Sequence, residues 1–315
     1  MPNIGKKPLP PFRGMMPILP TAINEQGDVD EASTRRLVQY CLKLGAVAIG
    51  HLGGASEFQK VADGDRQRLV EITVDEVAKR VPVFIGATAT NTRSAVRYAT
   101  LAQELGADML MVGIPYVAKP TQSEVWDYYK AISEAVTIPI IVQDIPESDA
   151  LLTVDFVWRM YQELENIHYV KAEGQDFIAK SLALLERAQG KMGVIGGAGG
   201  THLIHLLRIG VTSFMTGTEA LDIHTAVVQA YLRGDEETAA QVYYNRLLPY
   251  LMFYTEHNRE LLKWILYHRG IIDCPKVISP VGRPLMSPAK WQEFEWVLDR
   301  VGLNTRWPDL GETLT

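Results

Sequence analysis

The sequence predicts a (β/α)8 barrel followed by a C-terminal helical extension. Eight apolar runs alternate with helix-like segments, and each strand–helix unit takes about thirty residues. The runs are continuously apolar, which is typical of parallel strands covered by helices. Eight such units in about 220 residues match a barrel. A doubly wound open sheet usually has fewer strands, and its dinucleotide-binding form carries a glycine fingerprint after the first strand. Here Pro20, Thr21 and Ala22 stand in that place.

Periodicity and stop signals give the individual elements. The predicted strands are residues 14–21, 46–50, 82–86, 108–112, 139–143, 168–172, 192–195 and 213–215. The predicted helices between them are residues 30–44, 65–80, 94–105, 122–136, 153–164, 177–189 and 201–209. In the first helix, for example, Leu37, Val38, Cys41 and Leu44 share one side, and Gly45 provides the stop.

The chain is therefore expected to have three parts. Residues 1–12 contain four prolines among the first eleven positions and are predicted to be a loose arm. Residues 13–220 form the barrel, and residues 221–315 contain only helical patterns, at 221–233, 235–254, 256–269 and 288–301. The apolar side chains of this last part favour packing on the barrel, with a subunit contact as the second option.

Composition excludes several classes of protein. The 315 residues are 47% hydrophobic and 22% charged, with a net charge of −6 and no basic run, which disfavours nucleic-acid binding. Two isolated cysteines offer neither a disulfide framework nor metal-ligand spacing. The sequence lacks an apolar span of transmembrane length, and its N-terminus lacks the apolar core of a signal peptide. We therefore expect a cytoplasmic protein without a membrane partner.

Lys171 is the residue around which a site is predicted. It lies near the carboxyl end of the sixth strand, between Val170 and Ala172. Burying an ammonium group is expensive, so a lysine in such a strand needs an explanation. Removal from water favours the neutral amine, which can attack a ketone and form a Schiff base. Glu173 shares its strand face, so a purely structural lysine–glutamate pair is the alternative.

Other candidate residues follow the other strands. In a barrel the carboxyl ends of the strands form the active-site face. Small or polar residues occur there at 20–21, 51–57, 114–116, 143–144, 196–200 and 216–218. Each glycine loop alone is explained by a tight turn, but their convergence around a lysine favours a site. Backbone donors at residues 53–56 and the Ser56 hydroxyl suit a carboxylate.

Histidines and Asp144 are weaker candidates. His51 is interpreted as a hydrogen-bonded loop histidine. His202 and His205 are three residues apart but have no third ligand in the pattern, so no metal site is predicted. Asp144 suits an acid or base, or a turn cap before Pro146.

With these residues the chain resembles the dihydrodipicolinate synthase / N-acetylneuraminate lyase family over about residues 13–302. The matching segments are Pro20-Thr21, Gly53 to Glu57, residues 82–86, Pro115-Tyr116, residues 139–141 with Pro146, Lys171, residues 262–265 and residues 280–285. The resemblance implies a (β/α)8 barrel with a helical C-terminal domain, and a class I lyase whose Schiff-base lysine is Lys171. It also implies a homo-oligomer, a dimer or tetramer.

The departures from the family pattern point away from lysine biosynthesis. Gly54 and Ala55 replace paired threonines, Gln143 replaces the proton-shuttling tyrosine, and Val117 replaces a second tyrosine. The arginine expected after Pro146 is absent. The Gln143-Asp144 segment and the Lys171/Glu173 pair look more like the branch that contains L-2-keto-3-deoxyarabonate dehydratase.

The sequence is therefore interpreted as a dehydratase for a 2-keto-3-deoxy sugar acid. Lys171, Glu173 and Asp144 are the predicted catalytic residues, and the sequence leaves open whether Glu173 or Asp144 is the main acid/base. The predicted substrate-binding residues are Gly53, Gly54, Ala55, Ser56, Tyr116, Gln143, Gly197 and Met215. No metal or organic cofactor is expected, because the imine is the electron sink. A pyruvate-dependent aldolase and a non-catalytic keto-acid-binding barrel are the alternatives.

Overall fold

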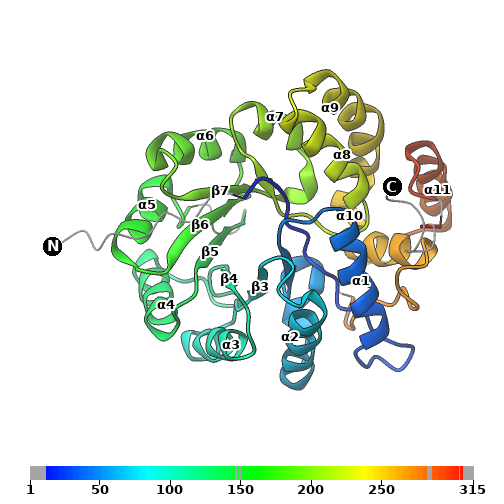
Figure 1. The fold of residues 1–315 in the computed structure, drawn as a ribbon. Coiled ribbons are helices and arrows are strands. Elements are labelled where there is room, and N and C mark those ends of the chain that lie inside the picture. Colours follow the sequence, from blue (N-terminus) through cyan, green and yellow to red (C-terminus); the bar gives the residue numbers. More distant parts are fainter. Residues whose placement is uncertain (1–11, 146–147, 149, 282–285, 305, 308–315) are drawn as a thin grey trace.

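Eight parallel strands form the centre of the molecule (Figure 1). The computed structural model describes residues 12–145, 148, 150–281, 286–304 and 306–307. The strands are β1 (Gly14–Met15), β2 (Ile49–His51), β3 (Val83–Gly86), β4 (Met109–Val112), β5 (Ile140–Asp144), β6 (Ile167–Ala172), β7 (Gly193–Gly196) and β8 (Ser213–Phe214). They pair in chain order, and β1 pairs with β8. The predicted barrel and its eight strands are confirmed. Most of the predicted N-terminal arm and Pro146 lie outside the described residues.

Backbone hydrogen bonds close the sheet between its first two strands. Ile18 forms a parallel bridge with Gly50. The amide of Val47 donates to Met15 at 2.9 Å, and that of Leu19 donates to Gly50 at 2.8 Å. The first strand was expected to span residues 14–21, but β1 has only two residues. Prolines at positions 17 and 20 lack the amide donor, so they interrupt regular pairing there.

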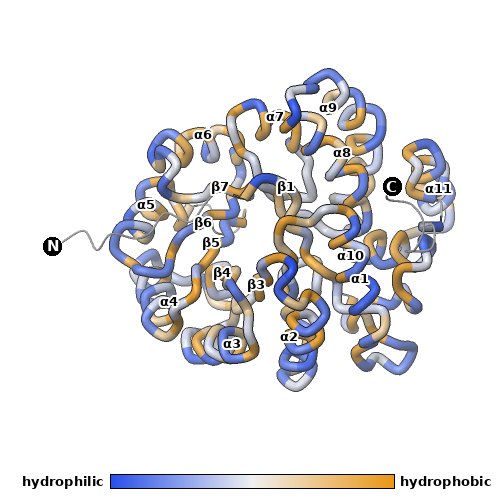
Figure 2. The backbone as a smooth tube through the Cα atoms, in the orientation of Figure 1, coloured by the Kyte–Doolittle hydropathy of each residue, from blue (hydrophilic) through white to orange (hydrophobic). Residues whose placement is uncertain are grey.

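Helices surround the strands as an outer ring. They are α1 (Glu31–Lys43), α2 (Asp63–Val77), α3 (Thr92–Glu104), α4 (Gln122–Ala135), α5 (Val154–Glu163), α6 (Phe177–Ala188), α7 (Leu203–Arg208) and α8 (Leu221–Leu232). Side-chain caps begin several of them, such as Asp30 on α1 and Thr121 on α4. Figure 2 shows hydrophobic residues along the strands and hydrophilic residues on the outer edges of the helices.

Two separate apolar layers follow from the alternation of side chains along each strand. One layer lies between the strands and the helices and includes Val142 and Val170. The other fills the barrel and consists of Met16, Ile18, Ala48, Phe84, Met109, Met111, Ile141, Tyr169, Ile195 and Met215. Because Tyr169 belongs to the inner layer, Lys171 two residues later points to the inside as well.

The C-terminal part contains α9 (Glu236–Val242), a π-helical turn η5 (Tyr243–Leu247), α10 (Leu248–His268) and α11 (Pro288–Val301). The break expected between residues 254 and 256 is wrong, because α10 runs through it. The helix changes character earlier, at η5, just before Pro249, which lacks the amide that would continue the α-helical bonding. Helix α8 contacts β1 and α7, so it takes the place of the eighth outer helix. The predicted division of the chain at residue 220 stays a prediction.

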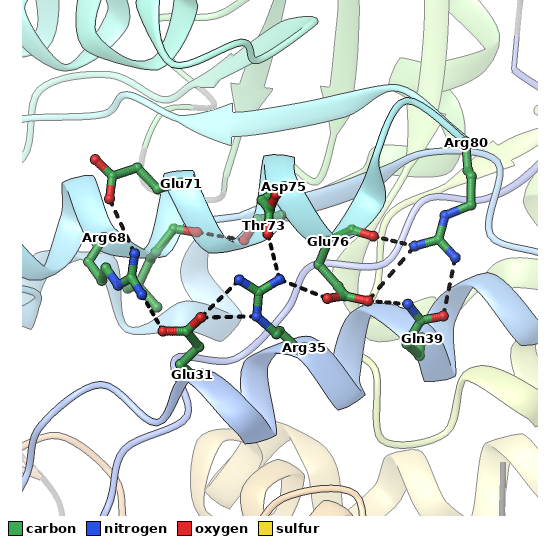
Figure 3. Close-up of polar contacts among 10 residues, drawn as sticks. Glu31, Arg35, Gln39, Arg68, Glu71, Thr73, Asp75, Glu76 and Arg80 are labelled. Atoms are coloured by element: carbon green, nitrogen blue, oxygen red, sulfur yellow. Dashed lines mark hydrogen bonds and ion pairs between the residues drawn. The ribbon is translucent and has the colours of Figure 1, made fainter.

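A network of charged side chains joins the outer faces of α1 and α2 (Figure 3). Arg35 lies at its centre and pairs with Glu31 at 2.8 Å, Asp75 at 2.7 Å and Glu76 at 2.9 Å. Arg68, Glu71, Gln39 and Arg80 extend it at both ends. These side chains are partly exposed, so each pair alone contributes little to stability. Any larger contribution comes from the network as a whole. In the described part of the chain, no helix has both the length and the apolar character needed to cross a membrane.

Candidate active site

A pocket of about 200 Å³ lies at the carboxyl ends of the strands. Residues from six of the strands, or from the segments that follow them, and from α10 line it. They are Ile18, Gly54, Ala55, Gln143, Ile145, Lys171, Glu173, Ala198, Gly199, Met215, Thr216, Gly217, Tyr254 and Leu262. The predicted lysine therefore lies in the wall of a cavity, on the face where barrels of this type hold their active sites.

Lys171 is fixed by the register of β6 with its neighbours. It pairs with Gln143 of β5 and Ile195 of β7. Its Nζ lies 2.8 Å from Oε2 of Glu173, and the two side chains are 6% and 12% exposed. This is the shared strand face that the two-residue spacing predicts. The pair is almost enclosed by protein but adjoins the pocket, so a small ligand can reach the amine.

Glu173 is held in one orientation by neighbouring donors. Its Oε1 accepts from the amide of Ala198 at 2.5 Å, and its Oε2 accepts from Nε2 of Gln143 at 3.2 Å. A methyl group at Gly197 would lie 2.5 Å from the carboxyl carbon of Glu173. Gly197 therefore allows the loop after β7 to close over this carboxylate, although it does not line the pocket. A carboxylate fixed in this way can exchange protons at a defined place.

Asp144 is not brought together with Lys171. Its Oδ2 lies 2.7 Å from Nζ of Lys180 on α6, and its Oδ1 accepts from the hydroxyl of Ser148 at 3.1 Å. The side chain is fully buried and does not line the pocket. Gln143 and Asp144 are adjacent in one strand, so they point to opposite faces, and only Gln143 points inward. The structure therefore directs Asp144 away from Lys171, and its predicted catalytic role stays a prediction.

The loop after β2 presents two of its four predicted residues to the pocket. Gly54 and Ala55 line the wall. The Ser56 hydroxyl is buried; it donates to the carbonyl of Leu19 at 2.5 Å and accepts from the amide of Gly53 at 3.2 Å. A methyl group at Gly53 would approach Met111 to 2.8 Å. Gly53 and Ser56 thus shape the loop from beneath, while Gly54 and Ala55 contact the cavity.

Of the predicted binding residues Tyr116 and Met215, only Met215 lines the pocket. Tyr116 lies outside the lining of the pocket, with its ring edge-on to Phe58 at 5.6 Å. Partial burial raises the pKa of its hydroxyl, and nearby Arg66 opposes this effect. Met215 lines the pocket and also belongs to the apolar interior of the barrel. It forms part of the pocket floor.

Several lining residues were not assigned individually from the sequence. Ala198, Gly199, Thr216 and Gly217 belong to loops that the strand ends already indicated. Tyr254 and Leu262 come from α10, far along the chain, and no strand-end signal marks them. Their spacing of eight residues places them on one helix face, which is the only local signal available.

The three candidate histidines lie on different elements: His51 ends β2, His202 precedes α7 and His205 lies within it. His51 is fully buried, and its Nδ1 lies 2.9 Å from Oγ1 of Thr73. Burial lowers the pKa of His51 to about 3, so it is neutral and structural, as interpreted from the sequence. The rings of His202 and His205 lie 6.1 Å apart. Throughout the described ranges, no three histidine, cysteine or acidic side chains group closely enough to hold a metal ion.

Comparisons with known proteins agree on one family. The model of the dihydrodipicolinate synthetase family matches residues 11–294. An L-2-keto-3-deoxyarabonate dehydratase from Azospirillum brasilense is 30% identical over 256 residues, 80% of this chain and 81% of the relative. A 4-hydroxy-tetrahydrodipicolinate synthase from Thioalkalivibrio sulfidiphilus is 30% identical, over 86% of this chain and 92% of the relative.

Solved structures give the same result. The dihydrodipicolinate synthase of Thermotoga maritima superimposes with a TM-score of 0.83 at 26% identity, covering 93% of this chain and 99% of that one. A prophage protein of the dihydrodipicolinic acid synthase family from E. coli K12, solved in complex with pyruvate, has a TM-score of 0.82 at 25% identity, with coverage of 93% and 99%.

Proposed function

The chain belongs to the dihydrodipicolinate synthetase family of lyases, and on that premise we propose that it dehydrates a 2-keto-3-deoxy sugar acid through a Schiff base on Lys171. One observation carries the proposal. The amine of Lys171 and the carboxylate of Glu173 are 2.8 Å apart in the wall of the pocket, and Gln143 holds the carboxylate. This arrangement supplies a nucleophile and an acid/base together.

The first stage is formation of the imine. The neutral amine of Lys171 attacks C2 of the keto acid, and a C–N bond forms. The former carbonyl oxygen accepts protons and leaves as water, which gives an iminium ion. Glu173 is placed to take a proton from the lysine across their 2.8 Å contact and to return protons to the departing oxygen.

The second stage is the elimination. The iminium acidifies C3, and the Glu173 carboxylate takes a C3 proton, leaving an enamine. The enamine electrons then form the C3–C4 double bond as the C4–O bond breaks, and Glu173 returns its proton so that the hydroxyl leaves as water. Hydrolysis of the conjugated iminium consumes one water and frees Lys171. The net change is the loss of one water from the substrate.

The replacement of a phenol by an amide supports Glu173 in this role. Gln143 occupies the strand-five position where the family pattern has a proton-shuttling tyrosine, and an amide side chain does not titrate. In the structure Gln143 instead donates to Glu173. A proton-transferring group is still required at the pocket, and Glu173 is the carboxylate that touches Lys171 there.

Several relatives at similar identity are named 4-hydroxy-tetrahydrodipicolinate synthase, so this activity is the competitor. The experiment is product analysis on purified enzyme with five- and six-carbon 2-keto-3-deoxy acids, and with pyruvate plus aspartate semialdehyde. The proposal expects a product one water lighter than the acid, with its carbon chain intact. Release of pyruvate with an aldehyde would assign an aldolase. Condensation of pyruvate with the semialdehyde at about 1 per second or faster would assign the synthase.

A further inference from the structure

The wall of the pocket is completed by a helix of the C-terminal part. Within the described residues, every lining residue comes from the first 217 positions except Tyr254 and Leu262 of α10. These two are eight residues apart and share one face of the helix. They add the one aromatic ring and a branched apolar side chain to the described lining of the pocket.

Each of these two side chains lies against a glycine of the pocket. A methyl group at Gly199 would lie 2.6 Å from Cε1 of Tyr254, and Gly199 also has a φ of +65°. A methyl group at Gly217 would lie 2.8 Å from Cδ1 of Leu262. The loops after β7 and β8 thus leave room for these two α10 side chains at the cavity. The contact is close, so the position of the Tyr254 ring is well defined.

Buried polar contacts hold this part of α10 on both sides. Tyr250, one turn before Tyr254, donates its hydroxyl to Oε1 of Glu219 at 2.7 Å, and both side chains are buried. Lys263, the residue after Leu262, lies 3.1 Å from Oε1 of buried Glu57 in the loop after β2. The helix is therefore tied to barrel loops at each end of the segment that borders the pocket.

The size of the pocket and the bulk of its walls give the consequence. The pocket has a volume of about 200 Å³, so the side chains that line it decide how much of a keto acid fits beside Lys171. A five- or six-carbon acid needs less of this space than a nine-carbon acid does. The Tyr254 ring is the largest side chain in the lining, so its removal frees the most space.

Resting on the proposed Schiff-base chemistry, we propose that Tyr254 is a specificity-determining residue that disfavours long 2-keto-3-deoxy acids relative to five- and six-carbon ones. Its aromatic ring closes the cavity against the chain end of longer acids. Leu262 supports this wall, and the Tyr250–Glu219 hydrogen bond positions it. The proposal assigns selection of chain length to the C-terminal helices and chemistry to the strands.

The test compares Tyr254→Ala with Tyr254→Phe. The rate of borohydride-trapped adduct formation is measured with pyruvate and with five-, six- and nine-carbon 2-keto-3-deoxy acids. We expect Tyr254→Ala to raise the nine-carbon to five-carbon ratio of trapping rates by about tenfold or more, the scale of discrimination in apolar pockets. Tyr254→Phe should keep the parental ratio, because it keeps the ring. All rates are expressed relative to pyruvate trapping by the same variant, which corrects for any general change in the reactivity of Lys171.

Two results would overturn the proposal. One is an unchanged ratio in Tyr254→Ala, and the other is an equal loss of trapping with all acids, pyruvate included. If Tyr254→Ala does not fold, Tyr254→Leu keeps an apolar side chain and serves the same comparison. The readout does not require dehydration. A shifted ratio in an enzyme that releases no dehydrated product would contradict the proposed function alone, and failure to trap any keto acid would contradict both.

Discussion

Two buried lysine–carboxylate pairs lie on opposite faces of the sheet. Lys171 and Glu173 are 2.8 Å apart and line the pocket. Lys180 and Asp144 are 2.7 Å apart, with exposed side-chain fractions of 10% and 0%, and they lie between β5 and α6. The inner pair, Lys171/Glu173, and the outer pair, Lys180/Asp144, are both buried and have the same chemistry. Only the first adjoins a cavity that admits a substrate.

The comparison shows that a buried charge pair does not by itself identify an active site. Two charges removed from water need each other and further hydrogen bonds to offset their desolvation, and a structural pair meets this condition as well as a functional one. Glu173 receives its bonds from Ala198 and Gln143, and Asp144 receives one from Ser148. Access to the pocket separates the two, and single-residue alternation along the strand decides that access.

The largest expected effect comes from removing the lysine of the inner pair. Lys171→Ala should abolish turnover of 2-keto-3-deoxy acids, because no other described lysine lines the pocket to form the imine. Steady-state assays of product formation check this. Lys180→Ala is the matched control, and its folded fraction should retain turnover within a few fold. Undiminished turnover in Lys171→Ala would remove the basis of the comparison.

The next effect concerns the carboxylate of the inner pair. Glu173→Gln keeps the shape and a hydrogen-bonding group but removes the titrating oxygen. Dehydration should fall by about 100-fold or more, because general acid–base catalysis commonly contributes that much. Borohydride should still trap the substrate on this variant, so that imine formation and elimination separate. Near-parental turnover in Glu173→Gln together with an inactive, folded Asp144→Asn would reverse the two roles.

Breaking the outer pair should lower the stability of the protein. Asp144→Asn leaves Lys180 buried without its carboxylate, and loss of one partner from a buried pair costs about 3–5 kcal/mol of unfolding free energy. Urea denaturation measures this, with turnover per folded molecule as the second readout. The double variant Asp144→Asn/Lys180→Met should regain part of the loss, because it removes the isolated charge. A stable Asp144→Asn that has lost turnover would contradict the structural assignment.

Glu219 is a third buried carboxylate, and among the described residues no lysine forms an ion pair with it. Tyr250 donates to its Oε1, and within the described residues its Oε2 has no hydrogen-bond partner. Burial raises the pKa of Glu219 from 4.5 to about 6, an effect that the Tyr250 bond opposes. A raised carboxyl pKa means that the folded state binds the proton more tightly. The stabilisation is complete below pH 4.5 and is lost as the pH rises through 6.

The smallest expected effect concerns the titration of Glu219. The lost stabilisation amounts to about 2 kcal/mol, at 1.36 kcal/mol per pKa unit. Relative to the parent, Glu219→Gln should therefore gain about 2 kcal/mol of unfolding free energy between pH 4.5 and pH 8. Urea denaturation of both proteins at the two pH values measures it. A difference between parent and variant that does not change with pH would show that Glu219 does not titrate in this way.

Local pattern predicts the strands and the inner pair well. Eight apolar runs and the two-residue spacing of Lys171 and Glu173 are properties of single segments, and the structure confirms the barrel and places the pair on one face. The same spacing rule, applied to adjacent Gln143 and Asp144, separates them. Of these two predicted site residues, Gln143 lines the pocket and Asp144 faces α6, and the roles of both stay predictions.

Contacts between segments that are distant in the chain could not be predicted from local sequence patterns. The entry of Tyr254 and Leu262 into the pocket depends on how α10 packs on loops more than thirty residues earlier in the chain, which no single segment encodes. Helix α10 likewise continues through residue 255, where two separate helices were predicted. The oligomeric state, the cytoplasmic location and the roles of the site residues stay predictions.

The most direct test of the central claim is the position of the trapped adduct. The parent enzyme is incubated with pyruvate and borohydride, digested, and analysed by mass spectrometry of its peptides. We expect the reduced pyruvate adduct on the peptide that contains Lys171 and no adduct on Lys180, because Lys171 is the one lysine among the described residues that lines the pocket. An adduct on Lys180 or on any other lysine, with Lys171 unmodified, would contradict the account.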